Sequence, residues 1–182
     1  MSNAQGSNKT AWAIDPAHTE VTFKVKHLVI TTVTGTFSKF EGEVYADQDD
    51  FSDAEISFKI DVNSISTNNA DRDGHLKSDD FFSAEKYSHL VFSNGKLSKN
   101  ASGDYKLTGD LTIRDITKKV TLDVDYNGTV KDPWGNSKAG FEITGNINRK
   151  EFNLTWNAVT ESGGLLVGED VKLMISVQLA KA

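Results

Sequence analysis

Alternation of apolar and polar residues with a period of two constrains the fold of this chain more than any other feature. Residues 21–25 read Val-Thr-Phe-Lys-Val, which places apolar side chains on one face of a strand and polar side chains on the other. The same alternation recurs in 56–62, 107–113, 120–126, 141–147 and 171–179. Shorter or less regular strands are expected in 12–15, 37–46 and 89–97. A total of about eight or nine strands exceeds that of an average domain and predicts an all-β protein.

Turn residues between these strands predict antiparallel pairing. Asn94-Gly95 and Asn127-Gly128 supply residues that accept positive φ angles, and 102–104 and 133–136 are loops. From residue 104 to the end, strand follows strand with no room for a crossover helix. One apolar face per strand fits an antiparallel sheet that is closed on itself.

The segment 66–87 breaks the alternation and predicts the helical part of the chain. Asn68 or Asn69 is suited to cap a first helical turn. Ser78 precedes two aspartates and predicts the start of a second short helix, because acidic residues are favourable in a first turn. We therefore expect a short helical segment around 68–86.

Length and charge narrow the class of protein. The 182 residues suit one domain over 11–182, preceded by a disordered tail or artificial remnant at 1–10. A net charge of -6 argues against broad attraction of the whole chain to nucleic acid or to anionic lipid, and no apolar run is long enough to predict integral membrane association. Cysteine is absent, so disulfides and thiolate metal sites are excluded. The N-terminus lacks a signal peptide, which predicts a cytoplasmic protein, or a periplasmic or secreted one if a leader was removed.

Enzyme signatures are missing from the sequence. It contains no nucleophile elbow, no zinc-binding His pair on a helix and no dinucleotide fingerprint, so neither catalytic residues nor a cofactor are expected. The acidic residues of 47–53 are candidates for a calcium loop, yet they lack the glycine and the terminal glutamate of an EF-hand. A solvated loop is the favoured interpretation, and no metal site is predicted.

Charged residues on apolar faces are more informative. His27 continues the apolar face of 21–25, and Arg149 continues that of 141–147. A buried charge needs a partner or water. Arg149 therefore has three alternatives: it reaches solvent at a barrel rim, pairs with a carboxylate that closes one end, or awaits the polar head of a ligand. Arg114 falls on the face opposite Ile113 and is predicted to be exposed.

Aromatic residues are numerous enough to line an elongated pocket. The chain has 10 Phe, 3 Trp and 4 Tyr. A barrel of ~8 strands has an interior that is either filled by side chains or open to one small ligand. Residue patterns alone leave both alternatives open.

Several ordered motifs occur between Trp12 and about Leu179: Trp12-x-Ile14-Asp15-x-x-His18 with the strand after it, Gly35-x-Phe37-x-x-Phe40-x-Gly42, Arg72-Asp73-x-His75-Leu76-x-Ser78-x-Asp80-Phe81-Phe82, Gly109–Arg114 and Arg149-x-x-Phe152. In this order the motifs resemble the YceI-like family of bacterial polyisoprenoid-binding proteins. Asp115, Lys119 and Asn153 depart from the family pattern at expected turns.

The resemblance implies an eight-stranded antiparallel, lipocalin-like barrel with a short helical segment near one end. It also implies a non-enzymatic carrier or storage protein for a long-chain amphiphile: a polyisoprenoid, an isoprenoid quinone, or a fatty amide or acid. The residues expected to contact the tail are Phe23, Val25, Phe37, Phe40, Phe58, Ile60, Phe82, Phe92, Phe141, Ile143, Phe152 and Trp156. The candidates for the polar head are His27, Arg72, His75 and Arg149.

Three alternatives accompany this hypothesis. Arg72, Asp73 and His75 are equally suited to pin the helical segment to the barrel. An enzyme acting on a lipid-like substrate would need a buried titratable pair, for which His27 with an acid is the only candidate. A structural or stress-response protein would have a filled barrel. A homodimer is compatible with the fold, although no exposed apolar stripe in the sequence indicates one.

Overall fold

Eleven strands and one helix make up the computed structural model, which describes residues 8–158 and 166–182. The elements are β1 (Ala11–Ile14), β2 (Glu20–His27), β3 (Thr31–Phe37), β4 (Phe40–Tyr45), β5 (Glu55–Asp61), β6 (Ile65–Ser66), α1 (Ala70–Lys77), β7 (His89–Lys99), β8 (Tyr105–Ile113), β9 (Ile116–Lys131), β10 (Ser137–Asn148) and β11 (Val167–Lys181). Short 3-10 turns lie at Pro16–His18, Val62–Ser64 and Arg149–Phe152.

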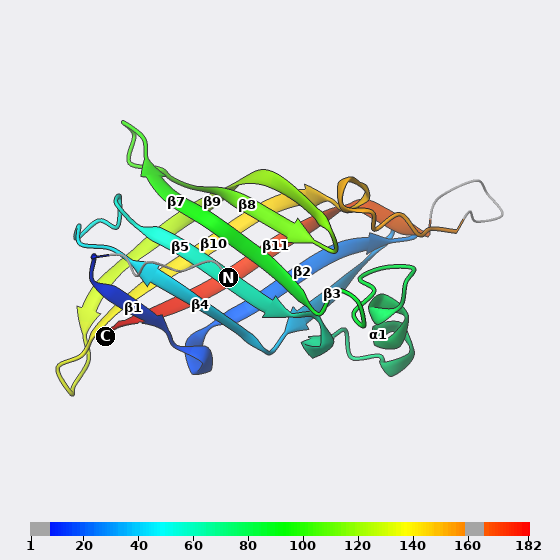
Figure 1. Ribbon diagram of the computed structural model, residues 1–182, viewed down its shortest axis with the longest axis horizontal. Helices are drawn as coiled ribbons and strands as arrows, with labels where there is room; N and C mark the ends of the chain where they lie inside the picture. Colours follow the sequence, from blue (N-terminus) through cyan, green and yellow to red (C-terminus); the bar gives the residue numbers. More distant parts are fainter. Residues whose placement is uncertain (1–7, 159–165) are drawn as a thin grey trace.

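The sheet closes through its last strand. β11 pairs with β10 along one edge and with β2 and then β1 along the other, while β1 also pairs with β4. β1 and β2 therefore share one position of the barrel, and β3 and β4 share the next. The result is a closed barrel of 8 antiparallel strands (Figure 1). The predicted fold class is confirmed.

The two Asn-Gly pairs lie inside strands rather than between them. β7 continues through Asn94, whose φ is 54°, and its pairing with β8 shifts register between Ser93 and Lys96. β9 continues through Gly128, whose φ is 106°, opposite a register shift in β10. The predicted turns were wrong because a β-bulge needs the same positive φ angle as a tight turn.

The helical segment is shorter than predicted. Asn69 caps α1, because its side-chain oxygen accepts a hydrogen bond from the Arg72 backbone N–H at 3.0 Å. Ser78 ends this helix instead of starting another one: its hydroxyl donates to the His75 carbonyl at 2.6 Å. The predicted second helix was therefore wrong. The residues that follow form turns that fold back over the barrel end.

The strand predicted over 37–46 corresponds to β4, and the strand before it, β3, was missed except for its last residue. β3 starts earlier, at Thr31, and β4 follows after a break at Ser38 and Lys39. The sequence of β3, Thr-Thr-Val-Thr-Gly-Thr-Phe, carries too few apolar residues to show the alternation.

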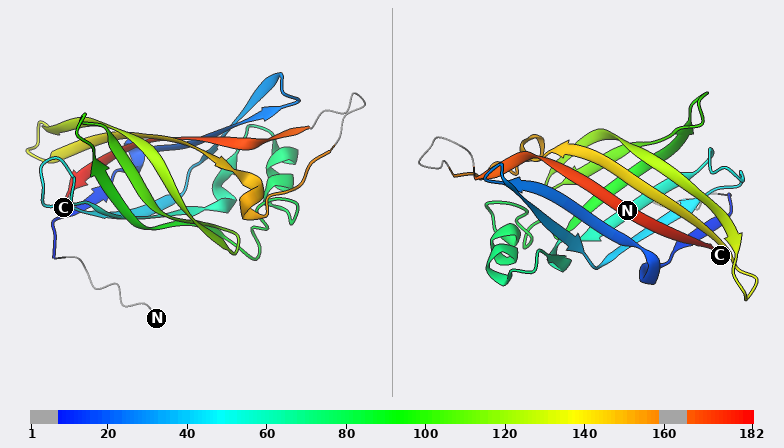
Figure 2. Two further views of the ribbon diagram at one scale, coloured as in Figure 1. Left: turned by 90° about the horizontal axis from the view of Figure 1, so that it is seen from above. Right: turned by 180° about the vertical axis from the view of Figure 1, so that it is seen from behind.

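One end of the barrel is closed by an aromatic plug. Phe51, in the loop between β4 and β5, is 2% exposed. Its ring centroid lies 5.0 Å from that of Trp12, 5.6 Å from that of Tyr126 and 5.0 Å from that of Phe141. α1, the 3-10 turn at Arg149–Phe152 and the β2–β3 hairpin lie at the opposite end (Figure 2).

The chain before β1 is only partly described. Residues 1–7 of the predicted tail lie outside the described residues, whereas the Thr10 N–H and hydroxyl donate to Asp47 Oδ1 at 2.9 and 3.0 Å. Within 8–158 and 166–182, no helix has the length and apolar character to span a membrane.

Candidate functional site

The interior of the barrel is hollow and consists of two adjoining cavities. The inner cavity, toward the Phe51 plug, has a volume of ≈ 150 Å³, and the outer cavity, toward α1, has a volume of ≈ 240 Å³. Six residues line both cavities and form what we call the waist of the lumen: Phe23, Phe37, Leu90, Ile113, Ile147 and Leu173. The structure thus favours the open barrel over the filled one.

The inner cavity is apolar throughout. Among the described residues, its only polar lining side chains are those of Thr22 and Ser57, and no ionisable side chain lines it. Burying a charged head in such a space would cost several kcal/mol or more. An alkyl or isoprenoid chain suits this cavity, and a charged group does not.

Glycines keep the lumen open because aromatic rings pack directly on their backbone atoms, close to the wall of the barrel. A Cβ atom on Gly42 would lie 2.7 Å from Phe58 Cδ2, and one on Gly109 would lie 2.4 Å from Phe92 Cζ. Real Cβ atoms do not approach other atoms so closely. Each ring therefore rests on the backbone of a neighbouring strand, which leaves the barrel axis free.

Among the described residues, ionisable ones line the outer cavity and not the inner one. Lys26, His27, Arg72, His75 and Arg149 line the outer cavity, and no Asp or Glu among the described residues does so. The lumen therefore has a polar, cationic mouth and an apolar closed end.

His75 has a fixed orientation at this mouth. Its Nε2 atom lies 2.9 Å from Asp80 Oδ2. Its ring centroid lies 4.7 Å from that of Trp156 at an interplanar angle of 85°, and 5.1 Å from that of Phe81. The Trp156 contact joins α1 to the segment after β10, and the Phe81 contact joins it to the turns that follow the helix.

Arg149 is buried and bonded to the backbone. It is 3% exposed, which rules out the first of the three alternatives, a position that reaches solvent at the rim. Its guanidinium donates to the carbonyls of Gly168 at 2.8 Å, Leu154 at 2.5 Å, Trp156 at 2.9 Å and Val167 at 3.3 Å. No carboxylate among the described residues forms a salt bridge with it, which rules out the second alternative as well. Burial lowers the pKa of Arg149 below its usual value.

Arg72 serves to anchor α1. Its Nε and Nη2 atoms donate to the Thr67 hydroxyl at 2.8 Å and to the Thr67 carbonyl at 2.7 Å. The Thr67 hydroxyl donates in turn to Asp73 Oδ1 at 2.6 Å, which also accepts from the Thr67 N–H at 2.8 Å. Thr67 is buried, so this network pins the helix to the strand end before it. It matches the structural alternative considered for Arg72 and Asp73.

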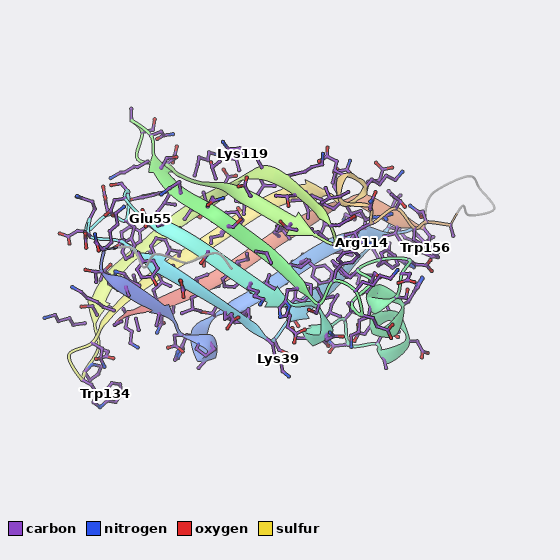
Figure 3. All side chains as sticks on the ribbon, in the orientation of Figure 1. Lys39, Glu55, Arg114, Lys119, Trp134 and Trp156 are labelled. Carbon is purple, nitrogen blue, oxygen red and sulfur yellow. The ribbon has the colours of Figure 1, made fainter. Side chains whose placement is uncertain are left out.

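Arg114 is half-buried, and the prediction of an exposed side chain was wrong. Its Nη1 atom donates to the carbonyls of Phe81 and Asn153, both at 3.2 Å. The φ angle of Arg114 is 54°, which breaks the alternation of faces at the β8–β9 turn. Figure 3 shows Arg114 and Trp156 at the α1 end of the barrel and Trp134 at the other end.

The predicted tail-binding residues mostly line the lumen. All except Phe40 and Phe152 line one cavity or both. Phe40 stacks on Phe58 with ring centroids 5.7 Å apart, and Phe152, 1% exposed, packs in the hydrophobic cluster beneath the mouth. Their contact with a ligand stays a prediction.

Aliphatic residues complete the lining and were missed by an emphasis on aromatic ones. The alternation in β8, β9 and β11 marked their inward faces. The missed residues include Leu107, Leu111, Val120, Leu122, Leu173 and Ile175.

The acidic loop supports the plug. Asp53 Oδ2 accepts from the Asp47 N–H at 2.9 Å and Asp53 Oδ1 from the Gln48 N–H at 3.0 Å. Burial opposes ionisation of this carboxyl, yet the backbone donors lower its pKa below the ordinary 3.8. Across the described parts of the chain, no cluster of His, Asp or Glu is arranged to hold a metal ion.

An antiparallel barrel with an apolar lumen and one polar mouth has the lipocalin-like architecture that the resemblance implies. Comparison with known families matches residues 12–179 to the YceI-like domain, so the chain belongs to this family, as predicted. A UPF0312 protein of Staphylococcus aureus is 37% identical over 172 residues, which are 94% of this chain and 98% of that protein.

Solved structures agree with this assignment. The Campylobacter jejuni YCEI protein is 32% identical with a TM-score of 0.73, covering 87% of this chain and 91% of its own. BcnA of Burkholderia cenocepacia is 22% identical with a TM-score of 0.75, over 91% and 98% of the two chains. A polyisoprenoid binding domain from Saccharophagus degradans is 13% identical with a TM-score of 0.68, over 96% and 100%. The last two share the fold.

Proposed function

We propose that this protein binds a long-chain amphiphile in its lumen, tail first, and carries or stores it without chemical change. One observation carries the proposal: the two cavities adjoin along one lumen, and among the described residues only the end opposite the plug is lined by ionisable residues. This polarity matches that of a molecule with one long tail and one head.

Burial of the tail supplies most of the affinity. Removal of apolar surface from water contributes about 25 cal/mol per Å², so a tail that buries roughly 300 Å² gains about 7 kcal/mol before the costs of association. The apolar groups of the waist and the inner cavity accept such a chain with no loss of hydrogen bonds. A polyisoprenoid or a fatty acyl chain fits this description.

The mouth favours an anionic head. Its lining carries cationic side chains and, within the described residues, no carboxylate. The Arg72 and Arg149 donors are engaged by the protein itself, so their charges act through space. His27, on the inward face of β2, stands at the hairpin side of the mouth and can hydrogen-bond the head directly. We therefore favour a carboxylate or phosphate head over a neutral quinone. The polyisoprenoid binding domain of Saccharophagus degradans, which shares the fold, supports an isoprenoid tail.

An enzyme acting on a lipid-like substrate is the weaker alternative. It would need a buried acid–base pair in the lumen. His27 is the predicted member of such a pair, but no carboxylate of the described residues lines either cavity with it. Binding without a chemical reaction needs only an apolar surface for the tail and polar groups for the head, and the lining has both.

Two neighbouring residues of β10 allow a matched test. Ile143 lines the inner cavity, whereas Glu142 points outward and is exposed. Ile143→Trp should fill the cavity and reduce uptake of a fluorescent long-chain fatty acid at least tenfold, and Glu142→Trp should bind like the parent. Thermal unfolding of both variants establishes that they are folded.

Native mass spectrometry after gentle purification provides the second measurement. We expect an adduct with the mass of an isoprenoid or acyl lipid on the parent protein. A homogeneous ligand-free mass, together with no uptake of the fluorescent fatty acid or of a prenyl phosphate, would contradict the proposal.

A further inference from the structure

The hairpin between β2 and β3 ends in three exposed apolar residues, which we call the apolar tip. Leu28, Val29 and Ile30 are 37%, 76% and 79% exposed. Figure 2 shows this hairpin reaching out from the barrel at the α1 end. Contiguous exposed apolar residues on a water-soluble surface commonly mark a contact with another molecule or a membrane.

The backbone of the tip is strained as well. Leu28 and Val29 have φ angles of 54° and 64°, in the left-handed region. A β-branched residue such as Val rarely adopts this conformation, and hairpin turns of this kind usually carry Asn or Gly. The sequence thus places large apolar side chains where small polar ones would be more stable. Val29 and Ile30, at 76% and 79% exposed, gain little packing from the described part of the chain, whereas Leu28 is largely covered.

The tip adjoins the mouth of the lumen. Val25, His27 and Val33, on the two strands of this hairpin, line the outer cavity. A surface that receives the tip therefore also lies beside the entrance through which a ligand passes.

A lysine patch lies behind the tip on the outer wall. Lys24 and Lys26 project from the outward face of β2, and Lys172 on β11 is the register partner of Lys24. Within 8–158 and 166–182, these three lysines form no salt bridge, and Lys26 donates only to the Thr32 hydroxyl at 3.2 Å. Adjacent like charges that form no salt bridge destabilise a sheet slightly and suit an anionic partner.

We propose that the apolar tip and the lysine patch dock this protein on an anionic lipid bilayer, with the mouth of the lumen beside the membrane. The inference rests on the proposed function, because a long-chain amphiphile resides in bilayers and must be withdrawn from them. Apolar side chains inserted at the headgroup boundary combine with basic residues near anionic lipids in many peripheral proteins. A symmetric pair of copies joined at the tip would bring their lysine patches together, which disfavours self-association.

Vesicle binding tests this docking directly. The full chain should co-sediment with vesicles of phosphatidylcholine and phosphatidylglycerol, bind phosphatidylcholine vesicles at least tenfold less well, and dissociate as NaCl concentration rises. Val29→Asp combined with Ile30→Asp should lower binding to the anionic vesicles at least tenfold. Val130→Asp is the matched control, because Val130 is 67% exposed near the opposite end, and it should bind like the parent. Lys24→Gln with Lys172→Gln should reduce the preference for phosphatidylglycerol.

A parallel measurement separates the two proposals. The Val29→Asp, Ile30→Asp variant should take up a fluorescent fatty acid from solution like the parent, yet extract it from vesicles more slowly. Two outcomes would overturn the docking but not the proposed function. In one, the parent takes up the fatty acid but does not bind the anionic vesicles. In the other, the parent and the tip variant bind these vesicles equally well. If the parent binds vesicles but takes up no fatty acid, the proposed binding of a long-chain amphiphile is overturned, and so is the inferred withdrawal of that ligand from the bilayer. If the parent is a dimer that does not bind vesicles, and the tip variant is a monomer, the tip serves self-association and the docking is overturned.

Discussion

The ring of Phe23 rests on the backbone of Gly35, its register partner across β2 and β3. A Cβ atom on Gly35 would lie 2.1 Å from Phe23 Cζ, a distance that real structures do not tolerate. Phe23 also belongs to the waist, since it lines both cavities. The absence of one methyl group on β3 therefore sets how far a phenyl ring projects into the passage between the cavities.

Gly35→Ala should narrow this passage. The added methyl group displaces the Phe23 ring toward the axis, and overpacking of this kind costs about 1–3 kcal/mol of stability. We expect affinity for a long-chain fatty acid to fall at least tenfold and affinity for a short-chain one to change less. Fluorescence titration measures both. Gly140→Ala is the control, because its Cβ would meet Asn127 Cβ at an ordinary 3.7 Å. Unchanged long-chain binding in Gly35→Ala would contradict a seating role for this glycine.

Phe51→Ala should open the closed end. Phe51 is 2% exposed and contacts three aromatic rings, so its truncation should lower the free energy of unfolding by about 3–5 kcal/mol. Urea denaturation measures the loss. Trp134→Ala removes an aromatic side chain that is 83% exposed and should change stability by about 0.5 kcal/mol or less. Similar losses in both variants would show that the plug does not stabilise the barrel.

Hydrophobic periodicity predicted most of the strands, because burial of one face of a strand requires every second residue to be apolar. It identified the inward faces of β2, β5 and β8 to β11. It missed the start of β3, where Thr residues replace the apolar ones, and it took two bulges for turns because both need a positive φ angle. A residue with a positive φ angle occurs both in a bulge and in a turn, and the local sequence does not determine whether the strand continues beyond it.

The sequence predicted the positions of the polar site residues better than it predicted their interaction partners. Alternation placed Arg149 on an inward face, and it is indeed buried, but its partners are carbonyls from residues 154 to 168. Backbone acceptors have no sequence signature, so the pattern suggested a carboxylate or solvent instead. Arg114 was misplaced for a related reason, since a positive φ at the β8–β9 turn redirects its side chain.

Arg149→Met should destabilise the mouth. Met is shorter than Arg and donates no hydrogen bond. Of the four carbonyls that accept from Arg149, only that of Val167 keeps another side-chain donor among the described residues, Asn157 Nδ2 at 2.8 Å, and each buried acceptor left unsatisfied costs about 1–3 kcal/mol. Hydrogen exchange should increase in residues 152–158. Lys150→Met is the control next in sequence: its 2.8 Å salt bridge with Glu169 is exposed and contributes about 0–1 kcal/mol. Equal effects of the two variants would refute the anchoring role of Arg149.

Asp79 should make the stability of the mouth depend on acid pH. The Ser83 hydroxyl donates to Asp79 Oδ1 at 2.6 Å, and this hydrogen bond, with the nearby Lys86 charge, lowers the pKa of the carboxyl below its ordinary 3.8. In the unfolded chain Asp79 keeps the ordinary pKa, so the ionised group stabilises the fold above pH 3.8. This contribution disappears as pH falls through the lower, folded pKa.

Comparison of the parent with Asp79→Asn isolates this dependence. Urea unfolding between pH 7 and pH 3 should show the parent to be more stable at neutral pH, with a difference that vanishes in acid because both side chains are then uncharged. Asp115→Asn alters the same charge at an exposed position in the β8–β9 turn and should give a difference near zero throughout. A parent-minus-Asp79→Asn difference that stays constant or grows as pH falls would mean that the Ser83 hydrogen bond does not favour the ionised carboxyl.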